Sequence, residues 1–314
     1  MLFVNKHHSP DRASDFHPRP TLKNAMAKSH GAGELTRSNS VVILSAARAI
    51  EPNGPNGNTE VTVNVYGIIP ARLHSTRLPR KLLLAETGRP LIEYTWRAAM
   101  LAKSLKQVIV AADSDEFAGV VSEFGGRCEL TGEHPSGTDR IAEVARRCCS
   151  DGDVFVNIQG DEPEIDPANI DAVVKALVDC PDAQMATLAT PMTSLEQVQA
   201  SSCVKVVVGG DGRALYFSRA AIPFCRDREP SEILASDQPW LLHLGIYAYR
   251  AEFLRQLTRL PPSRLEQLEK LEQLRALEAG ARIQVAIVEH HSVGIDTPDD
   301  YARFAERQRG RTAS

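Results

Sequence analysis

The sequence lacks the features that would place the protein in a membrane or in an oxidising compartment. The apolar run VVILSAA, which starts at Val41, is too short to cross a bilayer and begins too far into the chain for a secretion signal. The six cysteines show neither C-x-x-C spacing nor the paired histidine spacing of a zinc site. We interpret most of them as small buried hydrophobic residues of a cytoplasmic protein with no membrane partner.

A strong excess of charge of either sign is also missing. The formal net charge of −4 gives the chain no general attraction to nucleic acid or to anionic membranes. With 314 residues, 43% of them hydrophobic, the chain can form one large domain or two small ones around a substantial core. Any local cluster of cations therefore points to a small-molecule partner and not to nucleic acid.

Regular apolar spacing is absent from the first 63 residues. This segment is rich in His, Ser, Pro, Asn and Gly, as in EPNGPNGN from Glu51. Such a composition cannot bury enough apolar surface to offset the entropy lost on folding. We therefore expect residues 1–63 to form a disordered N-terminal extension and residues 64–314 to form the functional domain.

From Val65 onward, short apolar runs alternate with amphipathic segments. This alternation is typical of β-α units, in which a mainly parallel sheet is covered by helices on both faces. Ligands of such sheets bind beyond the carboxyl ends of the strands, so the residues after each strand matter most. The pattern predicts strands at 65–70, 107–113, 153–163 and 184–191, and helices at 91–102, 115–125, 140–148 and 170–179.

The second half of the chain has a different pattern. Residues 204–219 and 240–250 read as longer strands, the first of them interrupted by a turn at Gly209–Gly212, and they predict an antiparallel or mixed extension. Residues 264–280 carry a leucine at every third position, which predicts one helix with leucines spread too widely for a coiled-coil seam. We expect that helix to be buried on most sides and to end at Gly280.

A cluster of cations follows the first predicted strand. The stretch IIPARLHSTRLPRKLLL, which starts at Ile68, contains Arg72, Arg77, Arg80 and Lys81 but no glycine. Loops that bind phosphate through backbone amides are rich in glycine, so this loop is expected to bind its ligand mainly through side chains. The four cations favour a polyanion whose charge is spread along its length.

Polar side chains follow the next strands. Asp113 ends the second strand, and QGDEP after the third contains Gln159 and Asp161. Carboxylates close to a cation cluster favour a polyphosphate bound with a divalent metal, with Asp161 as the first candidate ligand. The alternative is that Asp161 only shapes a turn.

Two further segments have an equally plain structural explanation. Ser136 precedes a predicted helix, where its hydroxyl can cap the helix or bind a ligand. Asp296 precedes another helix, which Thr297 and Pro298 would open. Taken alone, this last segment is better explained as a helix cap.

Seven motifs in this order resemble one family far more specifically than any single motif does. They are IPARxxSTRLPxK, SGTDRIAEV, VNIQGDEP, LYFSRAAIPF, HLGIYAYR, LExLExLEQLRALExG and GIDTPDD, and they extend from about Tyr66 to Glu306. This set closely resembles the 3-deoxy-manno-octulosonate cytidylyltransferase family, also called CMP-Kdo synthetases. Sialic acid synthetases of the same fold differ in the first loop, where they have a Gly-Ser-Lys type of pattern.

The resemblance implies a fold, a reaction and an assembly. The fold would be an α/β, nucleotide-diphospho-sugar transferase-like three-layer sandwich with a mainly parallel mixed sheet and an antiparallel extension. The reaction would transfer CMP from CTP to the anomeric hydroxyl of Kdo with Mg²⁺ and release pyrophosphate, which activates Kdo for lipopolysaccharide synthesis. The enzyme would be a homodimer whose extension, about residues 203–262, binds sugar and pairs the subunits.

The resemblance also implies roles for individual residues of this sequence. Arg72, Lys81, Asp161 and Asp296 would be catalytic, and the two aspartates among them would bind the metal. The remaining assignments are Arg72, Arg77, Lys81, Asp113, Ser136 and Gln159 for the nucleotide, and Arg219, His243, Glu272 and Gln273 for the sugar acid.

The sequence departs from the family pattern at three positions. Arg80 stands where the family usually has Gly, so its side chain is expected to point to solvent, and Leu82 stands where the family usually has Pro. Ser202 occupies the place of a common Asn. These departures leave the roles of Arg80 and Ser202 open.

Three alternative functions remain at this point. The sugar acid could be an 8-amino analogue of Kdo or a sialic-acid-like sugar. A dinucleotide-dependent oxidoreductase is compatible with β-α alternation, but no G-x-G-x-x-G follows the first strand. A non-catalytic nucleotide-binding protein could lose the metal carboxylates, whereas Asp161 and Asp296 are both present.

Overall fold

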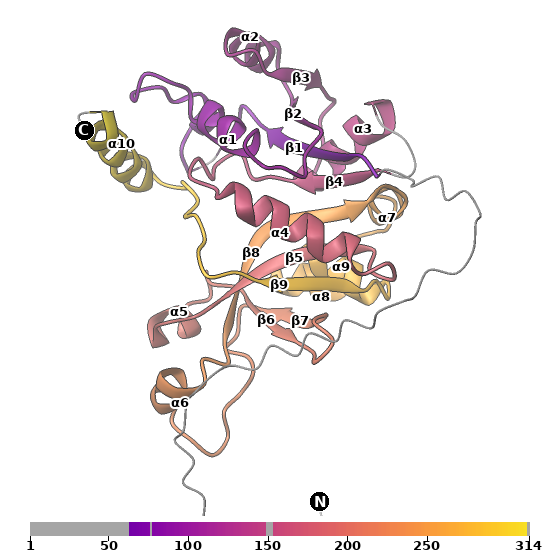
Figure 1. Ribbon diagram of the computed structural model, residues 1–314, viewed down its shortest axis with the longest axis vertical. Coiled ribbons are helices and arrows are strands. Elements are labelled where there is room, and N and C mark those ends of the chain that lie inside the picture. The colour runs from indigo at the N-terminus through magenta and orange to yellow at the C-terminus, as the bar shows by residue number, and fades with distance from the viewer. Residues whose placement is uncertain (1–62, 76, 149–152, 313–314) are drawn as a thin grey trace, which may run out of the picture. The chain divides into compact units, whose positions relative to one another are not determined.

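A nine-stranded mixed sheet organises the chain in a computed structural model that describes residues 63–75, 77–148 and 153–312 (Figure 1). Strands form at the predicted apolar runs, although the third run is a strand only as far as Asn157 and continues as a turn. The strands are β1 (Val65–Ala71), β2 (Gln107–Ala112), β3 (Arg127–Leu130), β4 (Val154–Asn157), β5 (Met185–Pro191), β6 (Lys205–Val208), β7 (Ala214–Ser218), β8 (Leu241–Arg250) and β9 (Ile283–Ile287).

The strand order is β3-β2-β1-β4-β8-β5-β9, with the β6–β7 hairpin attached through β6 to β8. Strand β8 is antiparallel to both of its neighbours, β4 and β5, whereas β3, β2, β1 and β4 pair in parallel, as do β5 and β9. The hairpin is antiparallel throughout. This topology confirms the predicted mainly parallel mixed sheet with an antiparallel extension, and it gathers the carboxyl ends of the parallel strands at one edge.

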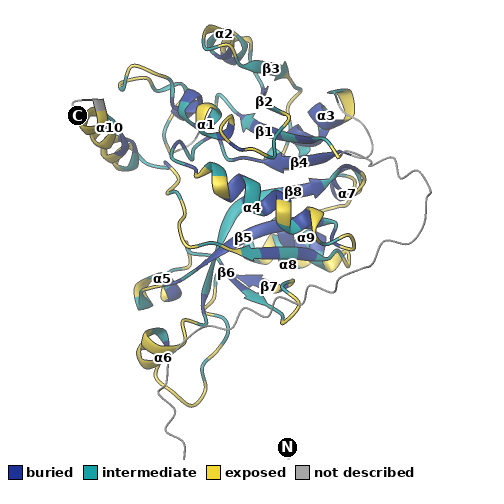
Figure 2. Ribbon diagram, in the orientation of Figure 1, coloured by how far each residue is buried: buried dark blue, intermediate teal, exposed yellow. Residues whose placement is uncertain are grey.

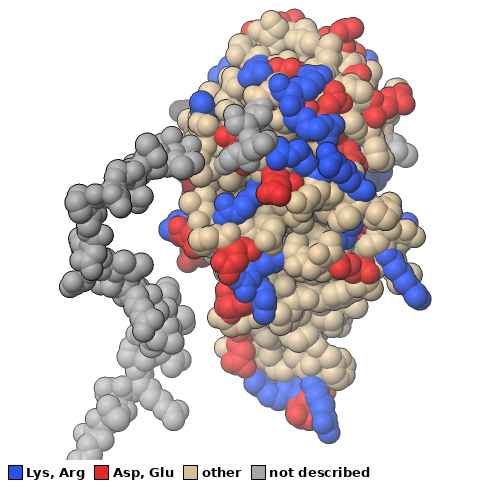
Figure 3. All heavy atoms as spheres, turned by 90° about the vertical axis from the view of Figure 1, so that its right-hand side faces the viewer, with Lys and Arg blue, Asp and Glu red and all other residues tan. Residues whose placement is uncertain are grey.

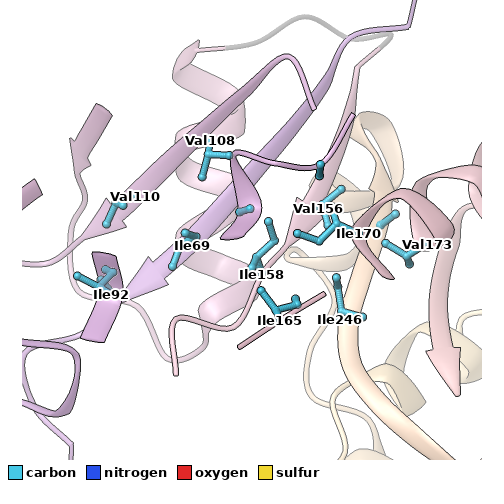
Figure 4. Packing of buried hydrophobic residues seen from close by; sticks show 14 of the residues in the cluster. Ile69, Ile92, Val108, Val110, Val156, Ile158, Ile165, Ile170, Val173 and Ile246 are labelled. Carbon is cyan, nitrogen blue, oxygen red and sulfur yellow. The ribbon is translucent and has the colours of Figure 1, made fainter. Parts of the chain in front are cut away.

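Helices cover both faces of the sheet and complete the predicted three layers (Figure 2). One core packs α1, α2, α4 and α10 against the sheet, and Figure 4 shows isoleucines and valines meeting in it. The other core packs α3, α7 and α9. The helices are α1 (Leu91–Ala99), α2 (Asp115–Glu123), α3 (Gly137–Cys148), α4 (Pro167–Val178), α5 (Leu195–Gln199), α6 (Pro230–Ser236), α7 (Ala251–Leu257), α8 (Arg264–Glu269), α9 (Gln273–Glu278), α10 (Pro298–Thr312) and the 3₁₀ turn η1 (Lys81–Leu83).

The prediction of one helix over residues 264–280 is wrong, because the chain breaks between α8 and α9. Lys270 adopts the left-handed conformation with φ of 55°, which no continuous right-handed helix allows. The break also divides the leucines, since Leu274 is fully buried whereas Leu268 is 70% exposed. Helix α9 stops before Gly280, as predicted.

Several expectations about the rest of the chain have mixed outcomes. The predicted disordered extension at residues 1–63 lies almost entirely outside the described residues and stays a prediction. The five cysteines within the described ranges are free thiols and only partly buried, so the interpretation of most cysteines as buried residues is wrong for these five. None of the helices described in the structure is long and apolar enough to cross a bilayer.

Figure 3 shows basic and acidic side chains interspersed on one face.

The conformation of Arg80 gives a physical reason for the glycine that the family pattern has there. Arg80 has φ of 55° and ψ of 28°, a left-handed conformation that glycine adopts without steric cost. Its half-exposed side chain forms an ion pair with Glu116 in the first turn of α2. The expectation that Arg80 points away from the ligand loop toward the surface is thus consistent with the structure, and its charge has a partner there.

We expect Arg80→Gly to be more stable than Arg80→Ala by about 1 kcal/mol. Both variants lose the exposed ion pair, which contributes about 0.2–1 kcal/mol, but only alanine keeps the left-handed strain of roughly 1–2 kcal/mol. The greater entropy of glycine in the unfolded chain reduces the difference. Urea denaturation of both variants measures it, and a more stable alanine variant would contradict the left-handed conformation of residue 80.

Candidate active site

Segments that leave the sheet at its carboxyl edge come together around Lys81. The loop after β1 supplies Arg72, Arg77 and Lys81, the turn after β4 supplies Asp161, and the segment between β9 and α10 supplies Asp296. The amide of Ile295 donates to the carbonyl oxygen of Asp161 at 2.9 Å and joins the last two segments directly. Residues that are far apart in sequence therefore meet because parallel strands end at the same edge.

The ammonium group of Lys81 lies between two carboxylates. Its Nζ is 2.6 Å from Oδ2 of Asp161 and 3.0 Å from Oδ1 of Asp296, and the residue is only 8% exposed. Arg77 binds the other oxygen of Asp296 at 2.9 Å. The two predicted metal ligands are thus close enough to share one cation.

A helix cap fixes the backbone beside Asp296. Oδ2 of Asp300 accepts hydrogen bonds from the amides of Asp296 and Thr297 at 3.1 and 2.9 Å, and from the Thr297 hydroxyl at 2.8 Å. In return, the Thr297 hydroxyl accepts from the amide of Asp300 at 3.2 Å. Thr297 therefore caps α10 as predicted, and Asp300 is a positioning residue that the sequence reasoning missed.

A cavity of about 290 Å³ opens beside Lys81. Arg72, Lys81 and Asp161 line it together with Gln159 and the backbone of Gly160. The Gln159 amide group donates to the carbonyl oxygen of Gly245 on β8 at 3.0 Å, so this side chain braces two strands where the cavity begins. The cavity combines cations with a carboxylate, a composition suited to an anion that brings its own metal.

Asp113 and Ser136 are engaged with the protein itself. One oxygen of Asp113 accepts from the amide of Leu73 at 3.0 Å, and the other lies 3.5 Å from the guanidinium of Arg140. Arg140 is 2% exposed, and burial lowers its pKa even though the nearby Asp113 charge opposes this. The Ser136 hydroxyl accepts from the amide of Asp139 at 3.1 Å, which confirms the N-cap of α3.

His243 lines a second cavity, of about 310 Å³, together with Ser202, Cys203 and Glu162. Burial lowers the pKa of His243 to about 3, so the ring is neutral at physiological pH. The Thr187 hydroxyl has one proton and faces the carbonyl oxygens of Ile246 and Leu244 at 2.8 and 3.1 Å. It therefore accepts from Nε2 of His243 at 3.1 Å, which leaves Nδ1 of the ring unprotonated.

Glu162 is an unusual acid in that cavity. Burial raises its pKa to about 7, and the charge of Asp161 adds to this increase, whereas a hydrogen bond from Ser292 opposes it. The Ser292 hydroxyl donates to Oε2 of Glu162 at 2.7 Å. Glu162 can therefore be a neutral hydrogen-bond donor near neutral pH, a property that its place in QGDEP did not suggest.

Glu272 and Gln273 line a third cavity, of about 260 Å³, with Tyr247, Thr138 and Gln159. Burial raises the pKa of Glu272, and a hydrogen bond involving Thr138 opposes the increase. The buried Nε2 of Gln273 has no hydrogen-bond partner among the described residues. This amide and the hydroxyl-bearing walls suit a ligand that carries several oxygen atoms.

Arg219, expected to bind the sugar acid, uses its guanidinium on backbone carbonyls. Nε donates to the carbonyl oxygen of Glu269 at 2.7 Å, and Nη1 donates to that of Ser201 at 2.9 Å. The four residues expected for the sugar are thus distributed: His243 lines one cavity, Glu272 and Gln273 line another, and Arg219 joins the segments behind them. The ring of Tyr247, 5.5 Å from that of His243, connects the two groups.

Comparison with known proteins identifies the family of this chain. A family model described as cytidylyltransferase matches residues 66–283. A 3-deoxy-manno-octulosonate cytidylyltransferase of Rhodopirellula baltica is 49% identical over 76% of this chain and 96% of its own length. This chain belongs to the 3-deoxy-manno-octulosonate cytidylyltransferase family.

Further relatives support the same family at the level of sequence and of fold. The family member of Geobacter sulfurreducens is 43% identical over 78% of this chain and 99% of its own length. A solved CMP:2-keto-3-deoxy-manno-octonic acid synthetase, in complex with CTP, aligns with a TM-score of 0.73 and 36% identity. It covers 79% of this chain and 99% of that structure, so the fold and the family resemblance stated from the motifs are confirmed.

We expect Asp300→Ala in this cytidylyltransferase to lower the free energy of unfolding by about 1 kcal/mol, as loss of a helix cap does. Transfer activity should fall about 10-fold to 100-fold, because Asp296 loses the contacts that orient it. The exposed neighbour Asp299 provides the control, since Asp299→Ala removes a carboxylate from the same turn without removing the cap. Equal effects of the two substitutions on kcat would contradict this role.

The pH dependence of stability gives a second measurement on the same residue. Burial raises the pKa of Asp300, but hydrogen bonds from Thr297 and from the amides of Asp296 and Thr297 outweigh it, so the net shift is downward. A lowered carboxyl pKa stabilises the fold above the unfolded value and loses that contribution as the pH falls through the folded value. The stability difference between the wild type and Asp300→Ala should therefore shrink in acid.

Proposed function

We propose that this protein transfers CMP from CTP to the anomeric hydroxyl of Kdo and releases pyrophosphate, which activates Kdo for lipopolysaccharide synthesis. The observation that carries the proposal is the cluster of Lys81, Asp161 and Asp296 at the carboxyl edge of the sheet. The relatives that are named for this activity align with this chain over nearly their full length. No covalent nucleophile is needed, because transfer of a nucleotidyl group depends mainly on positioning and charge neutralisation.

The chain's own cations are suited to bind the triphosphate. Arg72 and Lys81 line one cavity, and Arg77 reaches the same cluster through Asp296. Three positive charges near two carboxylates leave a net positive site, which can offset charge on the departing pyrophosphate. In this proposal Arg72 and Lys81 are catalytic, and Arg77 orients the nucleotide.

Asp161 and Asp296 would bind Mg²⁺ in this proposal. The two carboxylates are close enough together to bind one metal ion, since both lie within 3.0 Å of the same nitrogen atom, Nζ of Lys81. No group of three or more His, Cys, Asp or Glu side chains with metal-site geometry occurs among the described residues, and Mg²⁺ commonly takes one or two carboxylates with substrate phosphates completing its shell. When bound, the metal would lower the pKa of the attacking hydroxyl and neutralise phosphate charge.

The remaining residues are proposed to position the two substrates. Asp113 and Ser136 hold the loop after β1 and the start of α3, and Gln159 lies where two cavities meet, so these three side chains would shape the nucleotide site. His243, Glu272 and Gln273 would shape the sugar site. Burial raises the pKa of Glu272, and its carboxyl group together with the unpaired amide of Gln273 suits the hydroxyl groups of a sugar acid.

We also propose a cytoplasmic homodimer. Exposed apolar side chains on the extension at about residues 203–262, such as Leu215 and Phe224, support a protein contact there.

Two alternatives to the main proposal remain. In one, the enzyme uses another 2-keto sugar acid in place of Kdo; in the other, the protein binds the nucleotide without catalysis. Measurements of turnover with different sugar acids distinguish them from the main proposal.

The direct test measures pyrophosphate release with CTP or ATP and a panel of sugar acids. We expect turnover with CTP and Kdo, little turnover with ATP, and weaker turnover with 8-amino-Kdo and N-acetylneuraminate. If 8-amino-Kdo or N-acetylneuraminate is turned over faster than Kdo, that sugar acid is the substrate in place of Kdo. Binding of CTP without turnover of any sugar would favour the non-catalytic alternative.

We expect Asp161→Asn and Asp296→Asn to lower kcat about 100-fold or more while the melting temperature changes little. Each amide keeps one oxygen that can accept from Lys81, but a hard cation loses a charged ligand where negative charge develops. The double variant should be only slightly worse than either single one, because residues acting as a unit are not additive.

Asp299→Asn, on the exposed first turn of α10, serves as the matched control. If the two aspartates only shape a turn and a helix cap, stability should fall while kcat is largely retained. That result would overturn the metal assignment.

A further inference from the structure

Lys205 on β6 is a buried cation that binds only backbone oxygens among the described residues. The residue is 0% exposed. Its Nζ donates to the carbonyl oxygens of Ala200 at 2.9 Å, Cys203 at 2.6 Å and Arg219 at 2.6 Å. Three donors meet three acceptors, so the hydrogen-bonding capacity of the ammonium group is fully used.

Such a group is costly at this position, which calls for an explanation beyond packing. Removing an ammonium group from water costs several kcal/mol unless it is well paired, and every hydrogen-bond partner of the Lys205 ammonium among the described residues is a backbone oxygen. Burial lowers its pKa, and the charge of the Glu269 carboxylate opposes the decrease. A strand that needed only a core residue would be more stable with an apolar side chain here.

The partners of Lys205 belong to segments that form walls of two cavities. Ser202 and Cys203 line the cavity of His243. Val204, which precedes Lys205, accepts a hydrogen bond at its carbonyl oxygen from the amide of His243 at 2.8 Å. Lys205 thus holds the segment that follows α5 against β6, where that segment faces His243.

The third partner extends the contact to the other cavity. Arg219, whose carbonyl oxygen binds Lys205, donates through its guanidinium to the carbonyl oxygens of Ser201 and Glu269. The Glu269 carboxylate accepts from the amide of Arg219 at 2.9 Å and from the Ser218 hydroxyl at 2.6 Å. Lys270, Glu272 and Gln273, which follow directly, line the cavity of Tyr247.

We infer that Lys205 is a positioning residue that, through Arg219 and Glu269, holds the walls of both cavities in register and so sets the affinity for the sugar acid without touching it. The inference rests on the proposed function, because it assigns these two cavities to the acceptor sugar. Among the described residues, no hydrogen bond or ion pair joins Lys205, Arg219 or Glu269 to the residues that hold the nucleotide in that proposal. Its loss should therefore affect one substrate and not the other.

The test compares Lys205→Met with Lys175→Met, which changes an exposed lysine of α4. Methionine fills a similar volume but cannot donate to the three carbonyl oxygens. We expect KM for Kdo to rise about 10-fold or more in Lys205→Met, while the Kd for CTP, measured by calorimetry without sugar, stays within about twofold. Lys175→Met should match the wild type in both. Unchanged KM for Kdo, or a parallel loss of affinity for both substrates, would overturn the inference.

Hydrogen exchange separates failure of this inference from failure of the proposed function. If the wild type does not turn over CTP with Kdo, the proposed function fails, but the positioning role still predicts faster amide exchange at 200–203 and 269–273 in Lys205→Met. Exchange in β1 and β2 should remain unchanged. Uniformly faster exchange would mean a general loss of stability and would overturn the positioning role.

A second variant keeps the test decisive if Lys205→Met does not fold. Glu269→Gln retains an oxygen acceptor but loses the charge that faces Arg219 and Ser218. We expect the same selective rise in KM for Kdo and the same local pattern of faster exchange, but both effects should be smaller than in Lys205→Met. Wild-type values in both measurements would contradict the inference.

Discussion

The arrangement of the site depends on one buried ammonium group, that of Lys81, between the carboxylates of Asp161 and Asp296. The contact joins the loop after β1, the turn after β4 and the segment before α10. Lys81 is only 8% exposed, so its ammonium group needs these side-chain oxygens as acceptors in place of water, and an amide at either position still supplies one. This constraint explains why the surrounding backbone is so extensively bonded, from the Ile295 amide on Asp161 to the Asp300 cap beside Asp296.

Cations serve two different purposes in this chain. Arg72, Arg77 and Lys81 face a cavity or the carboxylates at its edge, where an anionic ligand can add to their partners. Lys205, which is buried, and Arg219, which is partly buried, instead bind carbonyl oxygens of the protein, and their hydrogen bonds connect β6 and the end of β7 with residues 200–203 and 269. A cation bonded to carbonyl groups fixes several backbone segments at once, because one ammonium or guanidinium group donates in several directions.

Local strain accompanies the segments that approach the site. Arg80 immediately precedes Lys81 and is left-handed, and Lys270 is left-handed at the break that turns Glu272 and Gln273 toward their cavity. The surrounding hydrogen bonds, including those on Glu269, compensate for the strain at that break.

The sequence by itself determined the β-α alternation, the cations after β1 and the carboxylates after β4 and before α10. These features are local, since apolar period and turn chemistry act over a few residues, and the ordered motifs added the family. Only the tertiary structure decided that β8 lies antiparallel between β4 and β5, that the leucine-rich segment breaks at Lys270, and that His243 and Glu272 line separate cavities. It also decided that the charges of Asp113 and Arg219 are used on partners within the protein. The physical reason is that the partner of a buried charge is chosen by the packing of distant segments, which no pattern within a single segment encodes.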